Sequence, residues 1–167
     1  MNKEDIEKYL RMLGQELQRH QVTGEILLAG GAVMLLEVQN REVTKDIDAY
    51  FNPEQANAIR EAAKVVAQRE GLADDWINDG VKGFFYKQPP AIKWAEYPGL
   101  RIYLTSLDYL LAMKVVAGRP QDIDDIKALA QKLNISNAQD ALILVKKYVP
   151  EQLLVPRIEY IIEEIFE

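Results

Sequence analysis

The chain has 167 residues, of which 49% are hydrophobic and 28% are charged, and its formal net charge is −6. This length and composition are typical of one globular domain, or of one domain with a helical extension, that buries a substantial core. An acidic chain is a poor candidate for binding nucleic acid through a broad basic surface. A locally basic cleft could still hold a nucleotide or an RNA end.

The sequence indicates neither export nor membrane insertion. No apolar run approaches the roughly 18 residues that a membrane span needs, and residues 1–7 lack the basic and apolar regions of a signal peptide. Because the chain has no cysteine, disulfides and thiolate metal sites are excluded. We therefore expect a cytoplasmic protein that does not associate with membranes.

The first half of the chain is predicted to alternate helices and strands. In chain order we expect a helix, a strand, a helix, a strand and a helix at residues 4–20, 25–29, 31–38, 46–51 and 53–70. Pro53 is tolerated in the first turn of the last of these helices, and Gly71 ends it.

The second half begins with β-like runs and then becomes helical. After a turn-rich connection, short strands are predicted at residues 81–86, 92–96 and 100–104, and helices at 106–117, 122–132, 137–147 and 151–166. This order predicts an α+β fold, a mixed β-sheet flanked by helices with a helical C-terminal part. We expect an α/β core over residues 1–105 and a helical part over 106–167 that packs on it.

The strongest functional signal is Gly30-Gly31 followed, after residues 32–45, by Asp46-Ile47-Asp48. Alternate strand residues share a face, so the two aspartates lie roughly 6.5–7 Å apart on one side of the strand. Carboxylates at this spacing can converge on Mg²⁺ or Mn²⁺, and the glycines can admit a phosphate. The alternatives are a tight turn at the glycines and solvated charges at the aspartates.

This arrangement, with an arginine and a threonine leading into the aspartates, resembles the nucleotidyltransferase superfamily that includes DNA polymerase beta. The pattern of that superfamily is a glycine pair, a helix and then Asp-x-Asp on a strand. The resemblance implies catalytic metal ligands at Asp46 and Asp48, and a nucleotide held by Gly30, Gly31, Arg41 and Lys45.

A second signal lies in the predicted helix 106–117, where Lys114 falls on the same stripe as four apolar residues. Burying a lysine on a core-facing stripe costs roughly several kcal/mol unless its ammonium reaches water or a partner charge. One interpretation is a snorkelling lysine, for which Lys114→Met would be neutral or stabilising. The other is that Lys114 enters the cleft of the two aspartates and meets a phosphate.

Two aspartates and an arginine follow this lysine. Asp122 is expected to be the N-cap of the next helix, and Asp125, three residues later, shares its face. Capping does not explain why Lys114 and Arg119 both lie just before that cap. Together the four residues form the pattern Lys-x-x-x-x-Arg-x-x-Asp-x-x-Asp.

The second pattern is similar to one in bacterial nucleotidyltransferase-like proteins, including the type IV toxin–antitoxin nucleotidyltransferase toxins. A small uncharacterised family among them combines Arg-x-Thr-x-Asp-Ile-Asp, a Trp-x-Asn-Asp segment (residues 76–79 here) and Leu-x-x-x-Lys-x-x-Ala-x-Arg-x-x-Asp (residues 110–122 here). The resemblance covers roughly residues 24–130. It implies catalytic roles for Lys114 and Asp122, and nucleotide contacts from Arg119 and Asp125.

The chain departs from this pattern at one point. Active polymerase-beta-like enzymes usually bring a third carboxylate to the metals from a later strand, and the strand predicted at 100–104 has no acid. Glu96 and Asp79 are the nearest substitutes. This departure bears on catalysis and not on the fold.

We therefore expect a Mg²⁺- or Mn²⁺-dependent nucleotidyltransferase that moves a nucleoside monophosphate from a nucleoside triphosphate to an acceptor hydroxyl. The acceptor would be an RNA end such as that of a tRNA, a protein or a small molecule. The alternatives are an inactive interaction module or toxin–antitoxin component of the same fold, with a partner protein or a second copy of the chain, and a purely structural α+β domain.

Overall fold

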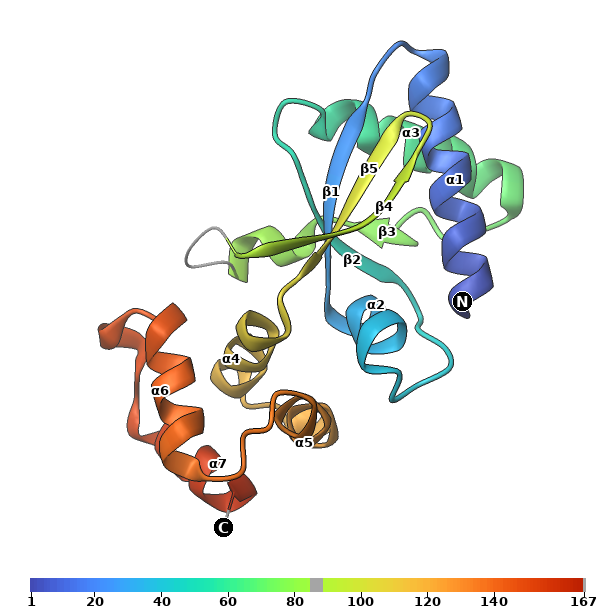
Figure 1. The fold of residues 1–167 in the computed structure, drawn as a ribbon. Helices are drawn as coiled ribbons and strands as arrows, with labels where there is room; N and C mark the ends of the chain where they lie inside the picture. The colour runs from blue at the N-terminus through green and yellow to red at the C-terminus, as the bar shows by residue number, and fades with distance from the viewer. Residues whose placement is uncertain (85–88, 167) are drawn as a thin grey trace. The chain divides into compact units, whose positions relative to one another are not determined.

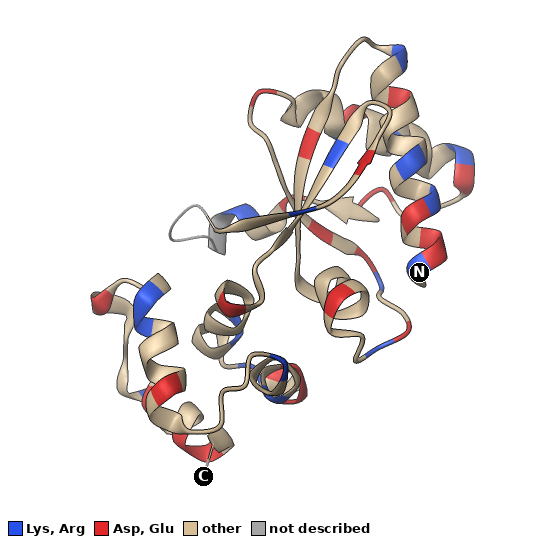
Figure 2. Ribbon diagram, in the orientation of Figure 1, with Lys and Arg blue, Asp and Glu red and all other residues tan. Residues whose placement is uncertain are grey.

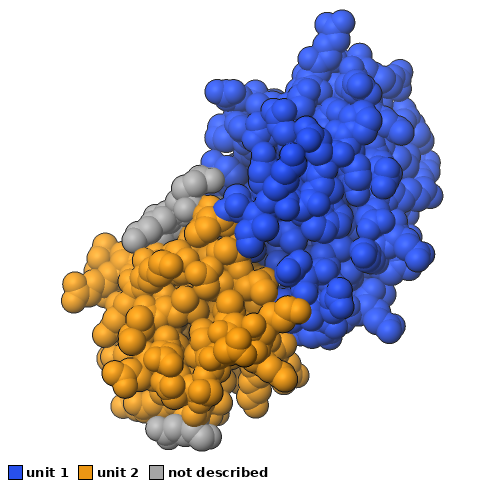
Figure 3. Space-filling view, viewed as in Figure 1, with its two compact units in different colours: residues 1–83, 91–105 blue, residues 84–90, 106–167 orange. Residues whose placement is uncertain are grey.

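The structure is a computed structural model that describes residues 1–84 and 89–166 (Figure 1). The chain divides into two compact units, which are coloured separately in Figure 3. The first contains residues 1–83 and 91–105, and the second contains residues 84–90 and 106–167. Of the helices in the described part of the chain, none combines the length and apolarity that crossing a membrane requires.

The first unit is built on a mixed sheet of five strands with the order β3-β2-β1-β5-β4. The strands are β1 (Gly24–Ala29), β2 (Ile47–Phe51), β3 (Ile77–Asn78), β4 (Ala91–Tyr97) and β5 (Leu100–Thr105). β1 is antiparallel to β2 and parallel to β5, β3 is parallel to β2, and β4 is antiparallel to β5. The predicted mixed sheet is confirmed, whereas β3 lies in a segment that was predicted to be a turn.

Two helices, α1 (Lys3–Arg19) and α3 (Ala56–Glu70), pack on each other and on one face of this sheet. A Cβ built on Gly24 of β1 would lie 2.9 Å from Leu17 and 3.3 Å from Ile59, so even-numbered residues of β1 face the helices. Because side chains alternate along a strand, the odd-numbered residues of β1 face the other side of the sheet.

Several predicted boundaries of the first unit are wrong. The helix expected at 31–38 begins at Gly30 as α2 (Gly30–Val33) and continues as a π-helical segment, η1 (Met34–Val38). α3 begins at residue 56 and not at 53, because the side chain and carbonyl of Asn52 hold residues 53–55 in a turn.

The prediction of a strand at 81–86 is also wrong for residues 81–84, the part of this range that the structure describes. A 3₁₀ helix, η2 (Gly80–Phe84), occupies residues 81–84, and residues 85 and 86 lie outside the described part. The pairing of β4 with β5 shifts between Lys93 and Ala95, so Trp94 forms a bulge. The predicted helix end at Gly71 is confirmed, since Gly71 has a φ of 68°.

The second unit is helical, as predicted. Its elements are α4 (Leu107–Ala117), η3 (Pro120–Asp122), α5 (Ile123–Lys132), α6 (Ala138–Tyr148), η4 (Glu151–Leu153) and α7 (Pro156–Phe166). α4 contacts α5, α6 and α7. The last helix begins at Pro156, and the residues before it form the separate 3₁₀ turn η4, because Pro156 is suited to a first helical turn.

Asp108, in the first turn of α4, joins that helix to α6. Its carboxylate accepts hydrogen bonds from the Ser106 hydroxyl (2.6 Å), the Tyr109 amide (2.8 Å) and the Tyr148 hydroxyl (2.6 Å). Burial alone would raise the pKa of Asp108, but these hydrogen bonds outweigh it and lower the pKa. Tyr109 and Tyr148 also stack edge to face, with ring centroids 5.0 Å apart.

We expect the Tyr148–Asp108 hydrogen bond to stabilise the second unit more at neutral than at acidic pH. The lowered pKa of Asp108 means that its contribution is complete above the unfolded-state pKa, near 3.9, and is lost as the pH falls through the folded-state pKa. Tyr148→Phe should therefore cost about 1 kcal/mol at pH 7 and less at about pH 3. Urea unfolding at both pH values checks this, with Tyr160→Phe, at a 70% exposed position, as the control. An equal cost at both pH values would contradict it.

Candidate functional site

Gly30 and the carboxylate of Asp48 lie against each other where β1 ends. The antiparallel register pairs Ala29 with Asp48, so the chain leaves β1 directly beside that carboxylate. A Cβ on Gly30 would lie only 2.6 Å from Asp48 Oδ2, and the φ of Gly30 is +59°. Both the backbone conformation and the close approach therefore require glycine here.

Gly31 is enclosed by the loop that leads into β2. A Cβ on Gly31 would lie 2.8 Å from Thr44 Oγ1 and 3.3 Å from Arg41 Nη1. The Thr44 hydroxyl donates a hydrogen bond to the carbonyl of Asp46 at 3.1 Å. The structure thus brings together the glycine pair and the Arg-x-Thr-x-Asp segment, while Lys45 of the same loop is exposed.

The alternation predicted for β2 is confirmed. Ile47, Ala49 and Phe51 are buried, whereas Asp48 and Tyr50 are half-buried on the opposite face. Asp46, which immediately precedes β2, is also half-buried. The aspartate-bearing face is the side of the sheet that α1 and α3 leave open.

No third acidic, histidine or cysteine side chain joins the two aspartates within residues 1–84 and 89–166 to form a group able to hold a metal. Asp79 is paired with Arg60 and Lys82; burial raises its pKa, but these two cations outweigh burial and lower it. Glu96 is paired with Lys93 at 3.2 Å.

Two carboxylates suit Mg²⁺ or Mn²⁺ bound together with a nucleotide. Mg²⁺ commonly takes one or two protein carboxylates and fills its remaining positions with water and substrate phosphates. The hard oxygen donors of Asp46 and Asp48 fit this pattern, and the close approach of Gly30 leaves no side chain between Asp48 and the start of α2.

The Trp-x-Asn-Asp segment has a structural role that the sequence did not reveal. The buried Trp76 donates its indole N–H to the Ala63 carbonyl at 2.9 Å and stacks edge to face on Tyr9. This anchors β3 to the helical layer and keeps Asn78 paired with Asp48 across β3 and β2. A two-residue strand has no periodicity, so only the buried tryptophan could have indicated it.

In the second unit, Lys114 is enclosed by two carboxylates. Its ammonium lies 3.1 Å from Asp122 Oδ1 and 3.1 Å from Asp125 Oδ2, and Arg119 Nε lies 2.7 Å from Asp122 Oδ2. Only 8% of Lys114 is exposed, so it does not snorkel. These four residues form a compensated cluster of two cations and two carboxylates.

Asp122 is the N-cap residue of α5, as predicted, but the expected side-chain capping bond is not made. The 3₁₀ turn η3 precedes α5, and within the described residues the Asp122 side chain accepts no hydrogen bond from the first amides of α5. Its carboxylate instead accepts hydrogen bonds from Lys114 and Arg119. The prediction that Asp125 shares a face with Asp122 is confirmed, since both contact the same ammonium.

The model of a family described as a nucleotidyltransferase of unknown function (DUF6036) matches residues 4–150. The chain belongs to this nucleotidyltransferase family. The matched residues include both the glycine–aspartate site and the compensated cluster. Among curated proteins, none matches the sequence significantly.

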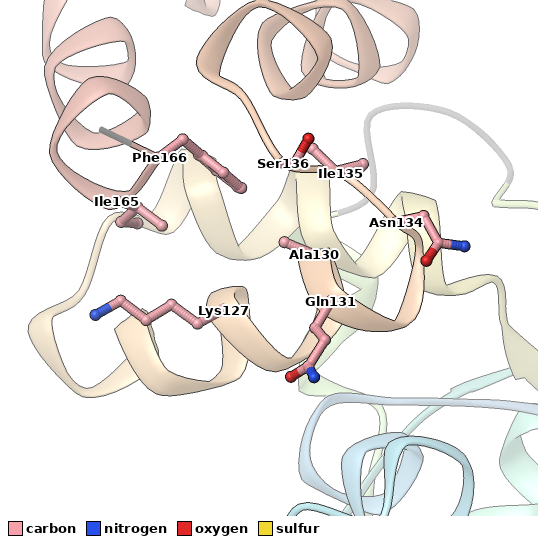
Figure 4. A pocket seen from close by; sticks show the side chains of 8 residues that line it. All are labelled: Lys127, Ala130, Gln131, Asn134, Ile135, Ser136, Ile165 and Phe166. Carbon is pink, nitrogen blue, oxygen red and sulfur yellow. The ribbon is translucent and has the colours of Figure 1, made fainter.

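An open pocket of about 550 Å³ lies in the second unit of the protein (Figure 4). It is bordered by α5, the connection after α5 and the end of α7, with Lys127 and Phe166 among its lining residues. The pocket contains none of the residues that the sequence motifs single out. It therefore shares no lining residue with the candidate site.

We expect Gly30→Ala to destabilise the protein more than Gly71→Ala does. Both glycines have a positive φ, but a Cβ on Gly71 meets nothing within 4 Å. Gly71→Ala should cost about 1–2 kcal/mol of backbone strain, and Gly30→Ala a further 1–3 kcal/mol, roughly, from overlap with Asp48. Urea unfolding measures both, and in an Asp48→Ala background the extra cost should vanish. Equal costs for the two glycines would show that Gly30 and Asp48 are not in contact.

Lys114→Met should destabilise the protein, which reverses the effect expected of a snorkelling lysine. The substitution leaves Asp122 and Asp125 buried without their shared cation, a change that costs about 3–5 kcal/mol. Adding Asp122→Asn and Asp125→Asn should recover much of that loss. Thermal melts of both variants test this, with exposed Lys127→Met as the matched control. An unchanged melting temperature for Lys114→Met would refute the cluster.

Proposed function

We propose that the chain is a metal-dependent nucleotidyltransferase that transfers a nucleoside monophosphate from a nucleoside triphosphate to an acceptor hydroxyl. The observation that carries this proposal is the contact between Gly30 and Asp48, which places a carboxylate at the start of α2 without a side chain between them. The family assignment supports the reaction class. The metal, the nucleotide and the acceptor are our inference.

Asp46 and Asp48 would hold one or two Mg²⁺ or Mn²⁺ ions together with the phosphates. A bound metal would neutralise phosphate charge and polarise the α-phosphorus. Gly30 and Gly31 would allow the β- and γ-phosphates to approach the backbone, and Arg41 and Lys45 would offset the remaining charge.

The reaction itself needs positioning more than covalent help. The acceptor oxygen forms a bond to the α-phosphorus, the bond from that phosphorus to the bridging oxygen breaks, and pyrophosphate leaves with the electron pair. The proton of the acceptor hydroxyl passes to a carboxylate of the aspartate pair or to water.

The finer relationships belong to the same proposal. We place the chain in the polymerase-beta-like superfamily, near the type IV toxin–antitoxin nucleotidyltransferases, on the glycine, aspartate and lysine–arginine–aspartate motifs. Substrate contacts of Lys114, Arg119, Asp122 and Asp125 stay predictions, since their charges already compensate one another within the second unit.

A non-catalytic interaction module or toxin–antitoxin component of the same fold is the second candidate. It is favoured by one observation, namely that the described residues bring no third metal-binding side chain to the aspartate pair. This candidate retains nucleotide binding and lacks transfer.

We expect metal and nucleotide to bind the site together, because two carboxylates alone form an incomplete shell. A non-hydrolysable nucleoside triphosphate should bind at least about 10-fold more tightly with Mn²⁺ than without it. Asp46→Asn combined with Asp48→Asn should abolish this difference and barely alter stability, since the carboxylates repel each other without metal. Calorimetry measures the affinities.

The matched control is Asp74→Asn with Asp75→Asn, which removes the same charge from exposed positions of the same unit. A Mn²⁺ effect that persists in the Asp46/Asp48 variant would place the metal elsewhere. Incubation with each labelled nucleoside triphosphate, Mg²⁺ and mixed cellular RNA and protein then separates the two candidates. Binding without label transfer would support the inactive module.

A further inference from the structure

The two aspartates of the candidate site are held in place by different contacts. Asp48 lies within β2 and is paired with Ala29 of β1 and with Asn78 of β3. Asp46 precedes β2, and neither of these two pairings includes it. Strand pairing therefore fixes the backbone of Asp48, whereas the backbone of Asp46 depends on other contacts.

The peptide group that joins Asp46 to Ile47 is held at both of its ends. Its N–H, which belongs to Ile47, donates a hydrogen bond to the Trp76 carbonyl at 2.8 Å. Its carbonyl, which belongs to Asp46, accepts a hydrogen bond from the Thr44 hydroxyl at 3.1 Å. Because a peptide group is planar, these two bonds together set its orientation and restrict the direction in which Asp46 presents its side chain.

The Thr44 hydroxyl is a donor whose own position is well defined. The Thr44 amide donates to the Met1 carbonyl at 2.9 Å, and the Met1 nitrogen donates to the Thr44 carbonyl at 2.8 Å. The hydroxyl oxygen lies against Gly31, since a Cβ on that glycine would be only 2.8 Å away. The connection from η1 to β2 alternates basic and acidic residues (Figure 2), and Thr44 carries its only hydroxyl.

The carboxylate of Asp46 has no protein partner in the part of the chain that the structure describes. It is half-buried and takes part in no hydrogen bond or ion pair with another described residue. Such a carboxylate can bind a metal without first giving up a protein contact. Its direction therefore depends on the backbone that carries it, and hence on the bond from Thr44.

We propose that Thr44 is a positioning residue for the metal ligand Asp46. In this role Thr44 contacts neither the metal nor the nucleotide and acts only by holding the Asp46 carbonyl. Contacts that orient a metal-binding carboxylate typically change metal affinity when they are removed. The inference rests on the proposed function and deepens it, because it names a residue on which metal binding at that site depends.

Calorimetry with a non-hydrolysable nucleoside triphosphate tests the proposal. The quantity of interest is the Mn²⁺ effect, which is the ratio of nucleotide affinity with Mn²⁺ to affinity without it. Thr44→Val keeps the shape of the side chain and removes the donor. It should lower the affinity with Mn²⁺ by about 10-fold and leave the affinity without Mn²⁺ unchanged. Thr44→Ser keeps the hydroxyl and should retain the Mn²⁺ effect of the unsubstituted protein.

Thr105→Val is the matched control. The buried Thr105 hydroxyl donates to the Leu28 carbonyl at 2.8 Å, so this variant loses the same kind of hydrogen bond within the same sheet. Thr105→Val should lower the melting temperature and leave the Mn²⁺ effect unchanged. If Thr44 served stability alone, the two valine variants would have the same Mn²⁺ effect.

Several results would overturn the inference. They are an unchanged Mn²⁺ effect in folded Thr44→Val, a reduced Mn²⁺ effect in Thr44→Ser, and an equal reduction in Thr105→Val. Should Thr44→Val not fold, Thr44→Ala removes the hydroxyl without a methyl group against Gly31 and gives the same measurement. Loss of folding in both would assign Thr44 to stability and overturn the inference.

The unsubstituted protein separates this inference from the proposed function. If it binds the triphosphate more tightly with Mn²⁺ and the Thr44 variants do the same, only the role of Thr44 fails. If it shows no Mn²⁺ effect, the proposed function fails, and the role of Thr44 fails with it.

Discussion

The site depends on the approach of a glycine backbone to a carboxylate at the end of β1. Gly30 turns with a positive φ and brings the start of α2 within contact of Asp48, a distance that no other residue permits. Antiparallel pairing of β1 with β2 sets this contact, and the Arg41–Thr44 segment closes over the next glycine. Two motifs that are separated in sequence thereby become one site on the face of the sheet opposite α1 and α3.

The sequence predicted the features that depend on periodicity and spacing. β2 alternates as expected because one face is covered by helices, and the glycine pair meets the Asp-x-Asp strand. β3 was not predicted, since a strand of two residues shows no periodicity. Its position depends on the buried Trp76, whose indole N–H bonds to a distant part of the chain. The π-helical segment after α2 was missed for a similar reason, because an apolar run does not specify which helix type forms.

Lys114 shows the limit of a helical-stripe argument. The stripe correctly indicated that Lys114 faces the interior of its unit, but it did not indicate what surrounds the ammonium. Asp122 and Asp125 supply that environment from the next helix, and the same contacts keep the Asp122 side chain from the capping bond that local sequence favoured. Tertiary ion pairing therefore overrides local propensity here, and it gives most of the second motif a structural explanation.

The edge strands of the sheet affect its tendency to pair with strands of other molecules. An edge strand presents unpaired N–H and C=O groups to any other extended chain, and long flat edges promote aggregation. β3 is only two residues long, and β4 is interrupted by its bulge at Trp94 and carries the charged residues Lys93 and Glu96. The β4 edge is therefore a poor template for a strand from another molecule, which protects this side of the sheet against edge-to-edge growth at high protein concentration.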